Sequence, residues 1–69
     1  MIDYSVERAL KVNDDVFNIG DNIVLFFNDN YILRCTLRYI TWLDEYTVGL
    51  MTDKGTHSMQ DINMILKDN

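Results

Sequence analysis

The chain has 69 residues with one cysteine, 48 % hydrophobic residues and a net charge of −5, which indicates one domain (1–69) with a small core and makes self-association an expectation. One cysteine excludes an intramolecular disulfide and a multi-cysteine metal site. The acidic balance disfavours nucleic-acid binding by long-range attraction, which depends on clustered Lys and Arg.

The sequence has no pattern of a membrane or secreted protein. No apolar run approaches the roughly 20 residues that span a bilayer. Residues 1–7 do not combine a basic region with an uninterrupted apolar segment, so they do not resemble a secretory signal. We therefore expect a cytoplasmic protein with no membrane partner.

Residues 2–12 have apolar side chains at helical spacing. Ile2, Val6 and Leu10 fall on one face, and Glu7 precedes Lys11 by one turn, as in a favourable ion pair. This spacing predicts a short N-terminal α-helix over about 2–12. Because an isolated helix of about ten residues is marginal in water, we expect it to dock on the rest of the molecule or on a second subunit.

Residues 17–67 alternate short apolar runs with polar turns, which predicts a small, strongly bent β-barrel of five strands. The runs expected to form strands are 22–27, 31–40, 46–51, 56–59 and 64–66. Turns are expected at 13–15, 28–30 and 52–55, where Asn, Asp and Gly favour turn conformations or tolerate positive φ. One helical turn is expected at 60–63.

The longest apolar run, 31–40, alternates. The alternation predicts a core face made by Tyr31, Leu33, Cys35, Leu37 and Tyr39. The opposite face then holds Ile32, Arg34, Thr36, Arg38 and Ile40. Cys35 is accordingly expected to be a small buried side chain and not a reactive thiol.

This order of elements resembles the Sm-like fold, including Hfq, and is similar to the small SH3-like barrels of YolD-like proteins. Residues 23–28 look like the first Sm strand and its turn, and residues 31–37 look like the second. The resemblance implies a mainly β, five-stranded SH3-like or Sm-like barrel. Gln60-Asp61 stands where Hfq-type proteins have a Lys-His pair, so the resemblance does not imply a uridine pocket here.

Three residues are candidate contacts for a ligand or partner. Arg34 and Arg38 form a cationic stripe on a predicted strand face, with guanidinium groups about 13 Å apart at roughly 3.3 Å per residue. They can pair with carboxylates of the same chain or a neighbouring subunit, or with phosphates. Trp42, in a predicted connection, is a candidate for stacking on a base.

Most carboxylates fall in predicted turns, where solvated charges favour solubility and turn formation. Asp14, Asp15, Asp44 and Glu45 are the candidate members of an acidic surface. Such a surface can mimic the phosphates of a nucleic acid and occupy the basic groove of a nucleic-acid enzyme, as small viral inhibitors of host defences do.

The sequence predicts no catalytic, metal or cofactor site. His57 is the single histidine and has no second histidine or thiol at ligand spacing, so we expect a solvent-facing or hydrogen-bonded side chain. Ser58 follows it on a predicted strand, where adjacent side chains point to opposite faces and cannot form a catalytic pair.

Several apolar positions are candidates for an assembly face. The strand at 22–27 is apolar on both faces, so Val24 and Phe26 join Val6 and Leu10 of the predicted helix in this role. Proline is absent from the chain, which leaves every strand amide available for edge pairing. The sequence thus favours a non-enzymatic binding or assembly module, a homo-oligomer that contacts a protein partner. The alternatives are an RNA- or nucleotide-binding Sm-like ring and an acidic, phage-type inhibitor that mimics nucleic acid.

Overall fold

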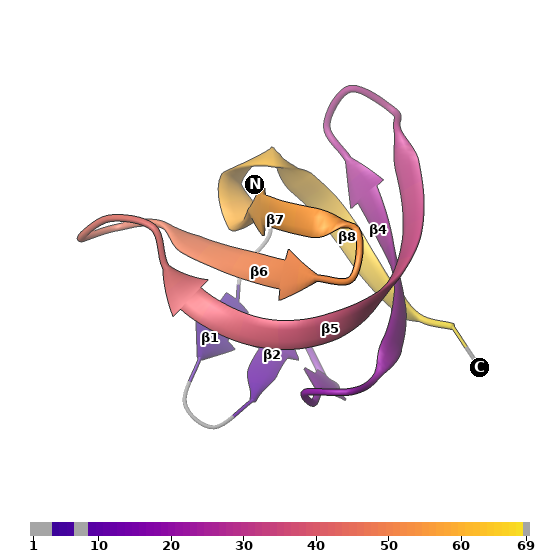
Figure 1. Ribbon diagram of the computed structural model, residues 1–69, viewed down its shortest axis with the longest axis horizontal. Helices are drawn as coiled ribbons and strands as arrows, with labels where there is room; N and C mark the ends of the chain where they lie inside the picture. The colour runs from indigo at the N-terminus through magenta and orange to yellow at the C-terminus, as the bar shows by residue number, and fades with distance from the viewer. Residues whose placement is uncertain (1–3, 7–8, 69) are drawn as a thin grey trace.

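The structure is a computed structural model that describes residues 4–6 and 9–68 of the chain. These residues form two antiparallel sheets and one short 3-10 helix (Figure 1). One sheet has three strands in the order β1-β2-β3, and the other has five strands in the order β7-β6-β5-β4-β8. The protein is therefore mainly β, as predicted.

The small sheet consists of β1 (Tyr4–Val6), β2 (Leu10–Val12) and β3 (Asp15–Phe17). The five-stranded sheet consists of β4 (Asn22–Phe27), β5 (Ile32–Trp42), β6 (Val48–Thr52), β7 (Gly55–Ser58) and β8 (Ile62–Lys67), and the 3-10 helix η1 (Met59–Asp61) precedes β8. The predicted strands and helical turn of this part all occur, with ends within two residues of those expected. In the described residues β7 and β8 are the edges of the sheet, so it does not close into a complete barrel.

The prediction of an N-terminal helix over about 2–12 is wrong, because the described part of this segment forms strands. In β1 and β2 the described residues pair as antiparallel strands, with Ser5 opposite Lys11. β2 continues into β3 through a turn in which Asn13 has a φ of 56°. Ile2 and Glu7, which also carried the helix prediction, lie outside the described residues.

Burial against the larger sheet explains why strands form in this segment. Leu10 and Val12 are buried while Lys11 between them is exposed, which is the alternation of a strand. Val6 and Leu10 are four residues apart, a spacing that fits both a helix and a strand, so periodicity alone does not separate the two in a short segment.

β5 belongs to both halves of the larger sheet, one formed with β4 and β8 and the other formed with β6 and β7. Its residues up to Thr36 pair with β4, and its residues from Leu37 onward pair with β6. Between Leu37 and Tyr39 the register shifts, and Arg38 is the extra residue of a β-bulge. Figure 1 shows the strong curvature of β5, which carries the chain from one half of the sheet to the other.

At this bend the backbone of β5 forms hydrogen bonds with two connections, the β6–β7 turn and the turn before β4. The N–H of Thr36 donates to Oδ1 of Asp53 at 2.8 Å, and the N–H of Asp53 donates to the carbonyl oxygen of Thr36 at 3.2 Å. Leu37 pairs with the turn before β4, since its N–H donates to the carbonyl oxygen of Asp21 at 2.9 Å and its carbonyl oxygen accepts from the N–H of Gly20 at 2.7 Å. Gly20 has a φ of 96°, a conformation that favours glycine.

The bulge changes which side chains of β5 face the core. Cys35 is buried as predicted, but Tyr39 is 65 % exposed, and Ile40 packs against the core instead. The predicted alternation is therefore wrong beyond Leu37, because an extra residue inverts it. Tyr31, also predicted to be buried, precedes β5 and is exposed, with its ring centroid 5.8 Å from that of Phe27.

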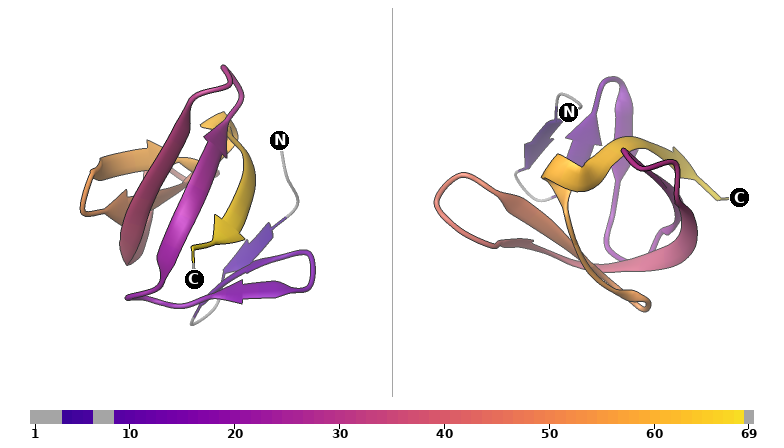
Figure 2. Two further views of the ribbon diagram at one scale, coloured as in Figure 1. Left: turned by 90° about the vertical axis from the view of Figure 1, so that its right-hand side faces the viewer. Right: turned by 90° about the horizontal axis from the view of Figure 1, so that it is seen from above.

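One hydrophobic core joins the two sheets. Its buried members among the described residues are Leu10, Val12, Phe17, Ile23, Leu25, Cys35, Leu37, Val48, Leu50, Met59, Ile62 and Ile65. The small sheet lies beside β8 (Figure 2), and Nζ of Lys67 lies 5.9 Å from the centroid of the Phe17 ring. In the described residues there is no helix with the length and apolar character needed to cross a membrane.

Candidate functional site

The outer side of β4 is apolar. Ile23 and Leu25 have no exposed surface and point into the core. Since side chains alternate along a strand, Val24 and Phe26 lie on the opposite side of the sheet, where both are half-buried.

The neighbouring strands extend this apolar surface on both sides of β4. Phe26 stands opposite Ile32 on β5 and opposite Met64 on β8. In the next row, Val24 stands opposite Arg34 and Leu66. Side chains opposite one another on the same face of antiparallel strands have Cβ atoms about 5 Å apart, so these rows form a continuous surface.

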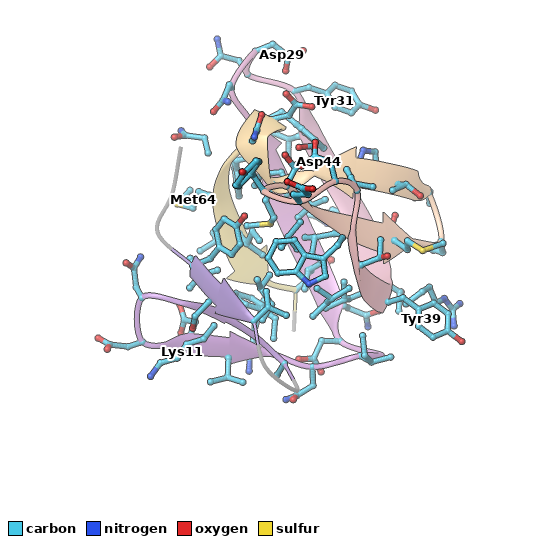
Figure 3. All side chains as sticks on the ribbon, turned by 90° about the vertical axis from the view of Figure 1, so that its left-hand side faces the viewer. Lys11, Asp29, Tyr31, Tyr39, Asp44 and Met64 are labelled. Carbon is cyan, nitrogen blue, oxygen red and sulfur yellow. The ribbon has the colours of Figure 1, made fainter. Side chains whose placement is uncertain are left out.

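We call this surface the apolar face and define it by Val24, Phe26, Ile32, Met64 and Leu66. Ile32 is 56 % exposed, Met64 42 % and Leu66 43 %. Figure 3 places Met64 on the outside of the molecule, on β8. Val24 and Phe26, the two candidates that the sequence placed on this strand, therefore belong to a larger surface. Its other members could be identified only from the strand register.

The other two candidates for the assembly face, Val6 and Leu10, lie in the small sheet and not on the outer side of β4. Leu10 has no exposed surface, so it cannot contact another subunit in this structure. Val6 is half-buried and packs against the same core. The sequence predicts both residues on the apolar face of a helix that docks on the rest of the molecule or on a second subunit. They belong instead to strands, in which Leu10 is part of the core and Val6 packs against it.

Both candidate arginines are exposed, and their surroundings differ. Arg34 borders the apolar face, opposite Val24, whereas Arg38 is the extra residue of the bulge in β5. Between them the hydroxyl of Thr36 donates to Oδ1 of Asn22 at 2.8 Å. Trp42 is 63 % exposed, at the last position of β5 and not in a connection.

The four candidate acidic residues lie in two separate connections. Asp14 and Asp15 are at the turn from β2 to β3, and Asp44 and Glu45 are in the loop from β5 to β6. Oδ1 of Asp44 accepts hydrogen bonds from the N–H groups of Tyr46 and Thr47, each at 2.8 Å. These hydrogen bonds, the one from Tyr46 foremost, hold the pKa of Asp44 below its ordinary value.

The loop that carries Asp44 belongs to a group of three connections that hydrogen bonds join. Asn28 donates from its backbone N–H to the carbonyl oxygen of Asp61 at 2.9 Å and from Nδ2 to the carbonyl oxygen of Gln60 at 2.9 Å. Nε2 of Gln60 donates to the buried hydroxyl of Thr47 at 3.0 Å. Gln60, one of the two residues at the Hfq-like position, thus links η1 to the β5–β6 loop.

We call the exposed carboxylates of these connections the acidic end and define it by Asp29, Asp44, Glu45 and Asp61. The described residues of the three connections, 28–31, 43–47 and 59–61, include no cation. A hollow of about 230 Å³ lies between Phe27, Asn28, Asp29 and Asp61. Figure 3 shows Asp29 and Asp44 on the upper half of the molecule and Lys11 at its lower edge.

His57 is only partly exposed to solvent, and one of its ring nitrogens lacks the hydrogen bond that the sequence allowed. Its side chain is half-buried, and its ring lies in a T-shaped arrangement with the ring of Phe27 at a centroid distance of 5.2 Å. Nε2 is buried and has no hydrogen-bond partner among the described residues. The hydroxyl of Ser58 accepts from the N–H of Gln60 at 3.1 Å, so this side chain caps η1.

Burial raises the pKa of the Cys35 thiol, which lies in the core. Within the described ranges, no group of three or more His, Cys, Asp or Glu side chains is placed to hold a metal ion. Two surfaces of the described residues gather side chains of one kind, the apolar face and the acidic end.

No protein-family model, curated protein or solved structure matches this chain.

Proposed function

We propose that this protein is a non-enzymatic binding and assembly module of the SH3-like or Sm-like kind, which self-associates and contacts a protein partner. The apolar face carries the proposal. Three of its side chains are exposed by more than two fifths on one side of a sheet. Contiguous apolar surface of this sort is typical of protein interaction sites, because water exclusion there favours association.

The arrangement of the strands supports the SH3-like or Sm-like assignment. β4 pairs with both β5 and β8, so the last strand returns to the first strand of the five. The bulged strand β5 contributes to both halves of the sheet. The five-stranded sheet covers one small core together with the small sheet.

Light scattering of the purified protein tests self-association. The chain has a mass of 8.1 kDa, and we expect the average molar mass to rise above that value as the concentration increases. Since apolar contacts are screened little by salt, the rise should persist at high ionic strength. A mass of one chain at every concentration and salt would contradict the proposal.

A second candidate function is supported by the acidic end. Four carboxylates with no described cation in the same three connections favour a basic protein surface as the partner, as in mimicry of a nucleic acid. Hydrogen bonds join the three connections that carry these carboxylates.

Competition with DNA tests this second function. We expect the protein to bind a Lys- and Arg-rich DNA-binding domain, to be displaced by duplex DNA, and to bind less tightly at higher salt. The double variant Glu45→Gln and Asp61→Asn should weaken binding, and Asp14→Asn with Asp15→Asn is the control with the same loss of charge. Equal effects of the two double variants would rule out the acidic end as the contact.

A further inference from the structure

We infer that the apolar face is a homodimer interface, at which two copies of the chain pack the same five side chains against each other. The inference rests on the proposed self-association and adds the residues and the geometry of the contact. In such an isologous interface each copy contributes the same patch, so the patch must complement itself. An apolar surface on the outer side of a sheet meets this condition, because two sheets can pack face to face about 10 Å apart.

The distribution of charge favours a second copy at this face. The chain has 11 acidic and 6 basic residues, so two copies repel each other where carboxylates meet. Of the described residues in the rows Ile32–Phe26–Met64 and Arg34–Val24–Leu66, Arg34 alone is charged. Packing the apolar face against itself opposes no carboxylates within these rows. Arg34 is exposed and lies at the border of the face, so the side chains at its centre carry no charge.

The size of the molecule indicates how stable the dimer is. A standard interface covers about 800 Å² per partner, which is roughly a sixth of the 4716 Å² of accessible surface of this chain. The apolar face supplies the dry centre of such a contact, and polar neighbours such as Asn22 and Thr36 supply its rim. The five side chains of the apolar face are far fewer than the roughly 20 to 30 residues per side of a standard interface. We therefore expect a weak dimer that dissociates on dilution. Its formation buries additional apolar surface of a domain with a small core.

The outer side of the half formed by β5, β6 and β7 can be compared with the apolar face. There Tyr39 stands opposite Met51, and Met51 stands opposite Thr56. The adjacent row consists of Thr41, Gly49 and Ser58, and the side chain of Leu43 lies over Gly49. This surface therefore combines apolar side chains with hydroxyl groups. Met51 is 39 % exposed and Met64 is 42 % exposed, which makes them a matched pair of methionines on opposite halves of the sheet.

Sedimentation analysis of two variants tests the inference. Met64→Glu places a carboxylate in the apolar face of both copies, and we expect it to raise the dimer dissociation constant at least about tenfold, the loss expected for an unpaired charge in an interface centre. Met51→Glu makes the same change outside the face and should leave the constant within about twofold of the wild-type value. Circular dichroism melts of both variants establish that they fold.

A second variant keeps the test valid if Met64→Glu does not fold. Ile32→Thr retains a β-branched residue with good strand propensity and removes apolar surface from the face, so we expect the dissociation constant to rise several-fold. A wild-type chain that remains monomeric overturns both the proposed self-association and this inference. A wild-type dimer that Met51→Glu dissociates and Met64→Glu does not overturns the inference alone.

Discussion

Asp53 supplies hydrogen-bond partners to the backbone of β5 at the point where this strand stops pairing with β4 and begins to pair with β6. Its carboxylate accepts from the N–H of Thr36, and its own N–H donates back to Thr36. The sequence assigned this residue only to a turn before Gly55, and that turn is confirmed, with a φ of 111° at Gly55. Its second role depends on a contact over 17 residues, which a local pattern does not contain.

Replacing Asp53 by Ala should lower the free energy of unfolding by about 1 kcal/mol, the usual value of a hydrogen bond at a position that water can reach. Urea denaturation monitored by tryptophan fluorescence measures this change. Asp14→Ala is the control, because it removes an exposed turn carboxylate of the same size. If the two variants lose the same stability, Asp53 does not hold the bend.

Asp44 gives the protein a dependence on acidic pH. Folding lowers the pKa of this carboxyl through the N–H groups of Tyr46 and Thr47, so the folded state binds the proton less tightly than the unfolded state. Its contribution to stability is complete above the ordinary aspartate value, near pH 4, and is lost as the pH falls through the lowered pKa.

An NMR titration of the Asp44 carboxyl carbon should therefore give a pKa below the ordinary aspartate value. In denaturation curves between pH 6 and pH 3, Asp44→Asn should lose less stability than the wild type, because an amide does not titrate. A titration at or above the ordinary value would show that these hydrogen bonds do not hold the carboxylate.

At the scale of elements, the five strands of the larger sheet could be predicted because each is an apolar run bounded by turn residues. Asn30 at the turn after β4 has a φ of 71°, as its residue type suggested. The N-terminal segment could not be assigned this way, since its apolar residues fit a helix and a hairpin equally. Its contacts with the larger sheet, which decide the outcome, are not visible in the local sequence.

The bulge in β5 can be tested by mutation, because it reverses which of Tyr39 and Ile40 faces the core. Ile40 packs against the core and Tyr39 is largely exposed. Ile40→Ala should therefore lower the free energy of unfolding by about 2 kcal/mol, while Tyr39→Ala should lower it by less than about 1 kcal/mol. Chemical denaturation of both variants measures the difference. A larger loss for Tyr39→Ala would mean that the alternation continues and the bulge is absent.

At the scale of the whole molecule, the sequence identified part of each surface. Val24 and Phe26 could be assigned to an outer face because β4 is apolar on both sides. Ile32, Met64 and Leu66 joined them only when the strand register was known. The acidic end likewise combines Asp44 and Glu45 with Asp29 and Asp61, which contacts between distant connections bring into one group. Asp14 and Asp15 belong to another part of the fold.

Self-association through the apolar face is the central claim, and an NMR dilution series tests it most directly. Amide chemical shifts are followed as the wild-type protein is diluted from millimolar to low micromolar concentration. We expect the changes to concentrate at residues 23–27, 32–36 and 63–67, with little change in β6 and β7. Shifts confined to β6 and β7, or a spectrum that does not change with concentration, would contradict the claim.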